Sequence, residues 1–158
     1  MIKVNDVQID RIQQMHHILK TCCKGNFYSP ISRDLSRGIK VLDIGSGPGT
    51  WIFDMSSEYP NSEFIGIEVQ EFMLPTIYPS NTKFIHNNVL EGIPYSPNSF
   101  DYVHMRCMTL CFTEQQYEQI LSDLLVLLKP NGYLELCEIQ LCSTNMGPYS
   151  EILSTESE

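Results

Sequence analysis

The sequence predicts an α/β fold built on a doubly wound parallel sheet with helices on both faces. Two apolar runs of strand length, 39–44 and 63–68, flank a segment with helical periodicity. A run that is apolar almost throughout is typical of a parallel strand covered on both faces. Because strands alternate with helices along most of the chain, right-handed crossovers would place helices over both faces of the sheet. The 158 residues suit one domain of this kind.

The chain begins with a helical lead-in, which we expect to occupy residues 1–38. Apolar residues recur at helical spacing between Ile9 and Leu19, so this helix should pack against one face of the sheet. We interpret His16 and His17 as surface or helix-packing residues rather than as ligands.

The remaining elements follow from periodicity and from breakers. Pro75 and Pro79 interrupt the second crossover. Thr113 and Gln116 have the spacing of a capping box at the start of the last helix, which ends before Pro130. In chain order we predict strand 39–44, helix 50–58, strand 63–68, a short broken helix after Phe72, strand 83–86, strand 100–105, helix 114–128 and strand 133–139.

The last predicted helix carries an apolar stripe at helical spacing, which we expect to face the core. Its members are Tyr117, Ile120, Leu121, Leu124, Leu125 and Leu128.

A glycine-rich turn follows the first predicted strand, in the segment Val41–Thr50 with the sequence VLDIGSGPGT. Gly45, Gly47 and Gly49 remove every Cβ at a place where a ligand can approach the backbone, and they tolerate positive φ. Glu68 lies 21 positions after Gly47, at the end of the next strand, where a carboxylate can accept hydrogen bonds from ribose hydroxyls. Together these features indicate an adenosine-binding crevice.

The glycine spacing separates two classes of cofactor. A dinucleotide fingerprint needs a glycine at the position that Thr50 occupies, which disfavours a nicotinamide-dependent oxidoreductase. The order Asp43, Gly45, Gly47, Gly49 instead resembles motif I of the class I methyltransferases that use S-adenosylmethionine. The resemblance implies a Rossmann-like sheet with strand order 3-2-1-4-5 and S-adenosylmethionine as the cofactor.

Further segments resemble the same family in the same order. Lys83–Arg106 is similar to its adenine-side motif and fourth strand, with Asn88 in place of the usual acid beside Val89. The amide oxygen of Asn88 can still accept a hydrogen bond from an amino group. Leu127–Ile139 resembles the Pro-x-Gly turn and fifth strand, and Ile9–Ile31 resembles the lead-in of fungal methyltransferase-domain proteins.

The resemblance also implies roles for individual residues. The glycine turn would contact the methionine part of the cofactor, with Asp43 steadying the turn or receiving the amino group through water. Glu68 would bind the ribose, and residues 69 and 87–89 would surround the adenine. The candidate cofactor-binding residues are Asp43, Gly45, Ser46, Gly47, Gly49, Glu68, Val69, Asn87, Asn88, Val89 and Arg106.

Other site assignments are less direct. His104 and Arg106 follow the fourth strand where the methyl acceptor should enter, although Arg106 could contact the cofactor carboxylate instead and His104 is more simply a satisfied strand histidine. In related proteins the lead-in lies over the cofactor, which makes Asn26, Phe27 and Tyr28 candidates for a lid. We assign no general base and no metal ligands.

The charge of the chain bears on its partners. The formal net charge is −9, and from Phe84 to Glu158 the only Lys or Arg residues are Arg106 and Lys129. Nucleic-acid binding depends on basic residues that contact phosphates, so a nucleic-acid substrate is disfavoured. We therefore expect a small-molecule acceptor, with a protein side chain as the alternative.

Composition also bears on the compartment. No stretch approaches the roughly 20 apolar residues of a membrane span, and the first residues do not read as a signal peptide. We expect a cytoplasmic or nuclear protein without a membrane partner. The six cysteines contain no C-x-x-C pair, so we interpret them as reduced and mostly packed thiols.

The element count ends before the family's last two strands, because about 19 residues follow Ile139. We expect a C-terminally truncated form whose fifth strand, with Leu134 and Leu136, is an open edge available for self-association. A catalytically impaired cofactor-binding fragment or a regulatory module is then the alternative to an active methyltransferase. The predicted regions are 1–38 for the lead-in and lid, 39–142 for the cofactor-binding core and 143–158 for a polar tail.

Overall fold

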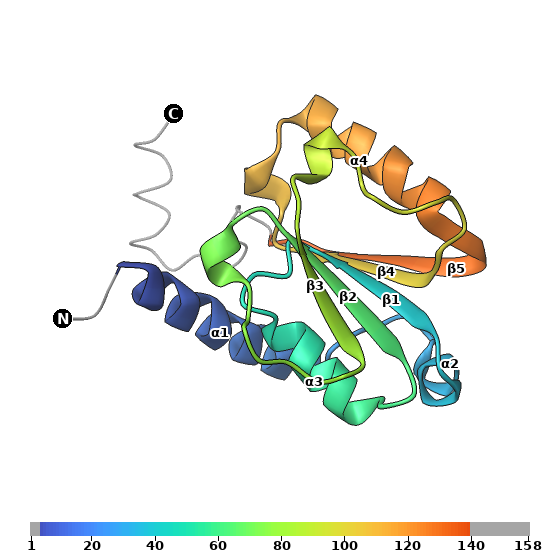
Figure 1. Ribbon diagram of the computed structural model, residues 1–158, viewed down its shortest axis with the longest axis horizontal. Coiled ribbons are helices and arrows are strands. Elements are labelled where there is room, and N and C mark those ends of the chain that lie inside the picture. The colour runs from blue at the N-terminus through green and yellow to red at the C-terminus, as the bar shows by residue number, and fades with distance from the viewer. Residues whose placement is uncertain (1–3, 140–158) are drawn as a thin grey trace, which may run out of the picture.

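The computed structural model describes residues 4–139 as a parallel sheet between two layers of helices (Figure 1). All neighbouring strands run parallel, in the order β3-β2-β1-β4-β5. This order confirms the predicted α/β class and the strand order that the family resemblance implied. The strands are β1 (Lys40–Ile44), β2 (Glu63–Glu68), β3 (Thr82–His86), β4 (Phe100–Arg106) and β5 (Leu128–Cys137).

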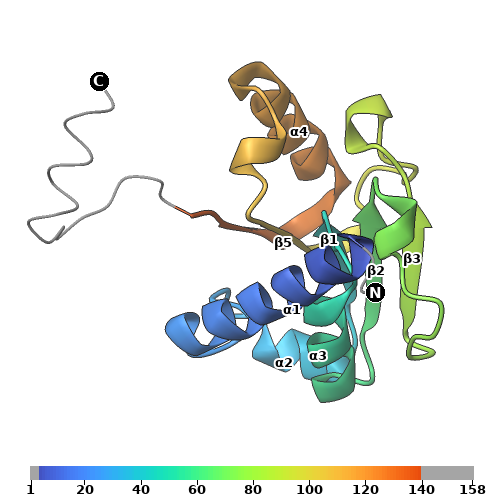
Figure 2. The same cartoon turned by 90° about the vertical axis from the view of Figure 1, so that its left-hand side faces the viewer.

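Four α-helices lie on the two faces of the sheet within residues 4–139. Helix α4 covers one face, while α1, α2 and α3 cover the other, with α1 beside α3 (Figures 1 and 2). The helices are α1 (Val4–Cys23), α2 (Ser32–Arg37), α3 (Thr50–Glu58) and α4 (Glu114–Leu127), and the 3₁₀ turns are η1 (Glu71–Met73), η2 (Val89–Glu91) and η3 (Thr109–Cys111).

Alternation along the strands divides the core into two clusters. Leu42 points to the α4 side, where it joins a cluster that contains Leu124. Its neighbour Val41 points to the opposite side and joins a cluster with Leu35 of α2 and Met55 of α3. Successive strand residues face opposite sides of a sheet, so an apolar strand supplies both clusters at once.

The structure corrects the boundaries around β5. Helix α4 ends at Leu127 and the strand begins at Leu128, whereas the sequence predicted a helix to 128 and a strand from 133. Leu128 pairs with Phe100 before a register shift, and regular pairing resumes where Tyr102 meets Tyr133. The bulge explains the error, because the Pro-x-Gly turn lies inside the strand rather than before it.

Two further predictions concern short helices. The broken helix expected after Phe72 is one 3₁₀ turn that contains Phe72. Helix α2 was not predicted, although its Leu35 is fully buried. The capping box is confirmed, because Thr113 accepts from the backbone of Gln116 and the Gln116 side chain accepts from the backbone of Thr113.

Side-chain exposure corrects one prediction for the core and shows how far the cysteines are buried. Leu125, expected in the core, is 60% exposed on the outer side of α4. The thiols of Cys22 and Cys111 are exposed, while those of Cys23, Cys107 and Cys137 are partly buried. The predicted tail 143–158 and Cys142 lie outside the described residues. Within residues 4–139, none of the helices combines the length and the hydropathy that a membrane span needs.

Candidate functional site

A cavity of about 540 Å³ opens at the carboxyl ends of β1, β2 and β4. The chain leaves β1 on one side for β2 and later returns on the other side for β4, so the strand order reverses at this point. Ligands of open α/β sheets bind in the crevice that such a reversal creates. Every candidate cofactor residue except Gly49 lines this cavity.

The glycine turn after β1 is bonded to the end of β2. Gly45 and Gly47 adopt positive φ values of 68° and 54°. The N–H groups of Gly45 and Ser46 donate to the carbonyl of Ile67, at 2.9 and 3.1 Å. The backbone donors at 45 and 46 are therefore already used within the protein, so these two residues would contact a ligand through other groups.

Glu68 joins the same turn through its side chain. Glu68 is 8% exposed, and its carboxylate accepts from the N–H of Gly47 and from the N–H of Gln70, each at 2.9 Å. A carboxylate oxygen has a second lone pair, so each oxygen can still accept from a ligand hydroxyl. The predicted pairing of glycine turn and distant acid is thus a direct contact.

The segment after β3 forms the opposite wall. Asn88 caps η2, with its side-chain oxygen accepting from the N–H of Leu90 at 3.1 Å. Asn87 donates to the carbonyl of Gly92 at 2.7 Å. Val69 and Val89 also line the cavity, Val69 being 52% exposed. The amide oxygen of Asn88 keeps one lone pair for a ligand, and the side chains of Val69 and Val89 are apolar. Together these groups suit a flat heterocycle.

Asp43 does not steady the glycine turn with its side chain. Asp43 is 4% exposed, and its carboxylate contacts Nδ1 of His104 at 2.8 Å. His104 is 2% exposed and stacks on Trp51, with ring centroids 4.0 Å apart and planes 5° from parallel. His104 is therefore the buried and partnered strand histidine that was the simpler expectation, and it also borders the cavity. Sequence reasoning missed Trp51, which follows the glycine turn.

The lead-in covers the site with α1 rather than with the segment predicted as a lid. Neither Asn26, Phe27 nor Tyr28 lines the cavity; the Asn26 carbonyl accepts from the Trp51 indole at 2.8 Å. From α1, four residues at helical spacing line it instead. They are Arg11, Ile12, Met15 and His16.

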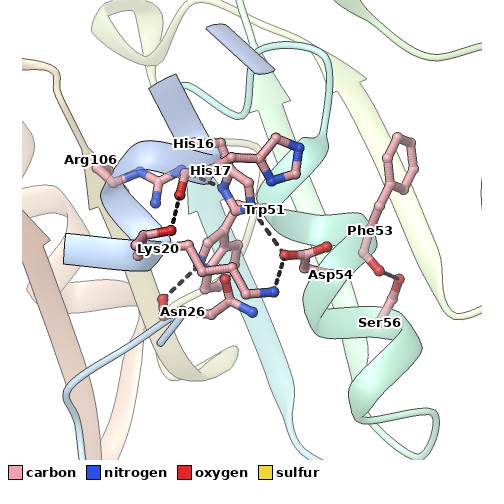
Figure 3. A network of polar contacts seen from close by, with 10 residues as sticks. His16, His17, Lys20, Asn26, Trp51, Phe53, Asp54, Ser56 and Arg106 are labelled. Atoms are coloured by element: carbon pink, nitrogen blue, oxygen red, sulfur yellow. Dashed lines mark hydrogen bonds and ion pairs between the residues drawn. The ribbon is translucent and has the colours of Figure 1, made fainter. Parts of the chain in front are cut away.

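A polar network fastens α1 to the rest of the site (Figure 3). Arg106, at the end of β4, is 2.9 Å from Nδ1 of His16. The other ring nitrogen of His16 lies 3.0 Å from the carboxylate of Asp54 on α3, which also accepts from Lys20. Of the two expectations for His16, the surface is wrong, because the residue is 2% exposed, and helix packing is confirmed by its contact with α3; His16 also lines the cavity. Burial lowers the pKa of His16 from its ordinary value, and the nearby Arg106 lowers it further.

Gly49 serves the packing beneath the cavity. It is the N-cap of α3 with φ 81°, and a Cβ built there would lie 2.6 Å from Cζ of Phe84. Its contribution to a ligand site is therefore indirect, through the approach of α3 to the sheet.

The cavity offers charged groups to a ligand. The hydroxyl oxygens of Ser46 and Thr50 are buried beneath its wall and have no hydrogen-bond partner among the described residues. Carboxylates and guanidinium groups occur together on the wall, as does apolar surface. This mixture fits a ligand with an amino-acid part, a sugar and an apolar ring, such as S-adenosylmethionine. No cluster of three or more His, Cys, Asp or Glu residues within residues 4–139 could hold a metal ion.

Comparison with known proteins identifies the family. The model of a family described as "Methyltransferase domain" matches residues 35–158. The chain belongs to the methyltransferase-domain family. This membership confirms the resemblance that the sequence motifs indicated, and with it S-adenosylmethionine as the cofactor.

Two similar curated proteins come from fungi. The chain is 35% identical over 106 residues to methyltransferase str3 of Strobilurus tenacellus. This alignment covers 67% of the chain and 37% of that protein. The chain is 28% identical over 142 residues to N-methyltransferase verN of Clonostachys rogersoniana, covering 87% of the chain and 49% of that protein. The chain thus spans half or less of the length of these curated relatives.

A solved structure shares the fold of the methyltransferase domain. The crystal structure of a SAM-dependent methyltransferase from Aquifex aeolicus has a TM-score of 0.62 and 18% identity, over 94% of this chain and 86% of that one.

Proposed function

We propose that the chain binds S-adenosylmethionine in the cavity at the β1–β4 switch point and transfers its methyl group to a small-molecule acceptor. The observation that carries the proposal is the contact of Glu68 with Gly47 on the wall of this cavity. It joins a glycine turn to a buried carboxylate, the two elements that hold an adenosine between neighbouring parallel strands.

Different residues of the cavity would contact different parts of the cofactor. Glu68 would accept from the ribose hydroxyls, and Asn88 would accept from the adenine amino group between Val69 and Val89. Arg106 would face the methionine carboxylate. S-adenosylmethionine supplies an electrophilic methyl on a good leaving group, so the chain mainly needs to orient the reactants and exclude water, which can be worth about 7 to 11 kcal/mol.

The proposal of a small-molecule acceptor is supported by the net charge of the chain and by the name of one relative. The chain carries a net charge of −9, which disfavours polyanionic substrates and mildly favours cationic ones. The relative verN is named an N-methyltransferase, and an amine is a small acceptor compatible with an acidic surface. A protein side chain is the alternative acceptor.

A second candidate function follows from length. Because the chain spans 37% and 49% of two curated relatives, the acceptor-binding part can belong to the remainder of such proteins. The chain would then be a cofactor-binding module without its own transfer activity. Methyl transfer by a longer form, but not by the 158-residue chain, would identify this case.

The first test is isothermal titration of the chain with S-adenosylhomocysteine, with NADH in parallel. We expect S-adenosylhomocysteine to bind and NADH not to bind. Glu68→Ala should weaken binding by about 10- to 150-fold, the range of a charged hydrogen bond worth roughly 1.5 to 3 kcal/mol. Glu71→Ala is the matched control, because Glu71 is exposed and lies outside the cavity wall. Equal affinities of the Glu68 variant and the unaltered chain would remove Glu68 from the site.

Self-association through the edge of β5 stays a prediction. Within residues 4–139, β5 pairs only with β4, and Leu136 is 40% exposed. We expect a concentration-dependent increase in mass by analytical ultracentrifugation that Leu136→Lys reduces, because charge on an edge strand opposes pairing. A monomer at all concentrations would contradict it.

A further inference from the structure

His16 has an unusual partner for a histidine next to the cavity, because Nδ1 lies 2.9 Å from a guanidinium nitrogen of Arg106. A guanidinium only donates hydrogen bonds, so Nδ1 must carry a lone pair and accept. The proton of a neutral ring is then on Nε2, which donates to Asp54 at 3.0 Å. Geometry alone therefore assigns both the protonation state and the tautomer of His16.

The groups around His16 maintain this state. Burial and the positive charge of Arg106 both oppose a second proton on the ring and lower its pKa. Lys20 donates to the same carboxylate of Asp54, and these hydrogen bonds lower the pKa of Asp54 despite its partial burial. Asp54 is thus an anion with two donors, and His16 is a neutral bridge between this anion and Arg106 (Figure 3).

Arg106 keeps donor capacity for a ligand. Its guanidinium makes one hydrogen bond with the part of the chain that the structure describes, and that bond goes to His16. The side chain lines the cavity. A guanidinium has five N–H donors in a planar fork that matches a carboxylate. The hydrogen bond to His16 fixes one guanidinium nitrogen of Arg106 and thereby sets the direction in which its remaining N–H groups point.

We propose that His16 is a positioning residue of the cofactor site: it orients Arg106 so that the free guanidinium donors bind the carboxylate of the cofactor's methionine part. This inference rests on the proposed function and deepens it, since it places carboxylate recognition in a contact between the lead-in helix and β4. The helix thereby contributes to ligand choice and not only to covering the cavity.

The test compares two ligands that differ only in the carboxylate. The 158-residue chain is titrated with S-adenosylhomocysteine and with its decarboxylated analogue. His16→Leu removes the acceptor, and we expect it to reduce the preference for the carboxylated ligand by about tenfold, the low end for a charged hydrogen bond. Binding of the decarboxylated analogue should change by less than about threefold, because it makes no use of Arg106.

Two further variants distinguish a positioning role of His16 from a general loss of structure. His16→Gln keeps an oxygen that can accept from Arg106 and an amide that can donate to Asp54, so it should restore the preference. His17→Leu carries the same substitution on the neighbouring residue, which is exposed and lies outside the cavity wall, and should keep the preference. Thermal unfolding of each variant confirms that it is folded at the titration temperature.

The outcomes distinguish the two proposals. Equal weakening of both ligands by His16→Leu, or an unchanged preference, would overturn the role of His16 while leaving the cofactor site intact. The same effect from His17→Leu would also overturn it. If the unaltered chain binds neither ligand, the proposed function fails and this inference fails with it.

Discussion

Gly49 shows how one residue can match a sequence motif and yet act through packing. Its position in the glycine turn suggested close approach of a ligand, but the cavity wall does not include it. Gly49 has a φ of 81°, and a Cβ at this position would lie 2.6 Å from Phe84. These are two separate reasons for a glycine here. The motif therefore combines residues that line the cavity at its start with a residue that serves helix packing at its end.

Gly49→Ala should destabilise the fold. A left-handed conformation costs a residue with a Cβ about 1 to 2 kcal/mol, and overpacking against Phe84 adds about 1 to 3 kcal/mol. Urea unfolding should show a loss of about 2 to 5 kcal/mol. In a Phe84→Leu background the cost of Gly49→Ala should fall towards the backbone contribution. The same cost in both backgrounds would show that the contact with Phe84 is not the cause.

At the scale of elements, α4 depends on a narrower apolar stripe than its sequence shows. Leu124 is fully buried against the sheet, while its neighbour Leu125 is 60% exposed. Helical spacing placed both in the stripe, but the sheet contacts only one side of it. A stripe read from periodicity includes flanking residues that contact no other element unless another layer covers them.

Truncation of the two leucines should therefore have different effects. We expect Leu124→Ala to lower the free energy of unfolding by about 2 to 5 kcal/mol, because it leaves a cavity in the core. Leu125→Ala should change it by no more than about 0.5 kcal/mol. Chemical unfolding of both variants measures the difference. A large loss from Leu125→Ala would indicate that a further element covers this face.

At the scale of the whole molecule, the buried network of His16 links stability to pH. His16 is surrounded by Arg106, Asp54, His17 and Lys20, and burial is the main cause of its lowered pKa. The unfolded chain binds a proton at His16 near its ordinary pKa of 6.5, while the folded chain binds it only at lower pH. Stability from this group is therefore complete above about pH 6.5 and is lost as pH falls through the folded-state pKa.

We expect the free energy of unfolding to decrease below about pH 6.5 by up to about 1.4 kcal/mol per pH unit from His16 alone. His16→Gln cannot take up a proton and should show a shallower decrease. His17→Gln, which changes an exposed ring, should keep the slope of the unaltered chain. Urea unfolding from about pH 7.5 down to about pH 5 measures all three. Parallel curves for His16→Gln and the unaltered chain would exclude His16 as the source.

The sequence by itself determined the α/β class, most of the strands and helices, and the pairing of a glycine turn with Glu68. Periodicity, capping and glycine spacing act over a few residues, so a single chain records them. The strand order came from resemblance to a family and was then confirmed.

Only the tertiary structure decided which distant polar groups meet. Asp43 and His104 are 61 residues apart, and His16 and Arg106 are 90 residues apart. No local pattern encodes such pairs, because they form only when the parallel crossovers place β4 beside β1 and α1 over the cavity. The same packing placed α1, rather than residues 26–28, along the cavity wall and directed Gly49 towards Phe84. Burial and partner choice belong to the packed molecule, since the free energy of a polar side chain depends on what surrounds it.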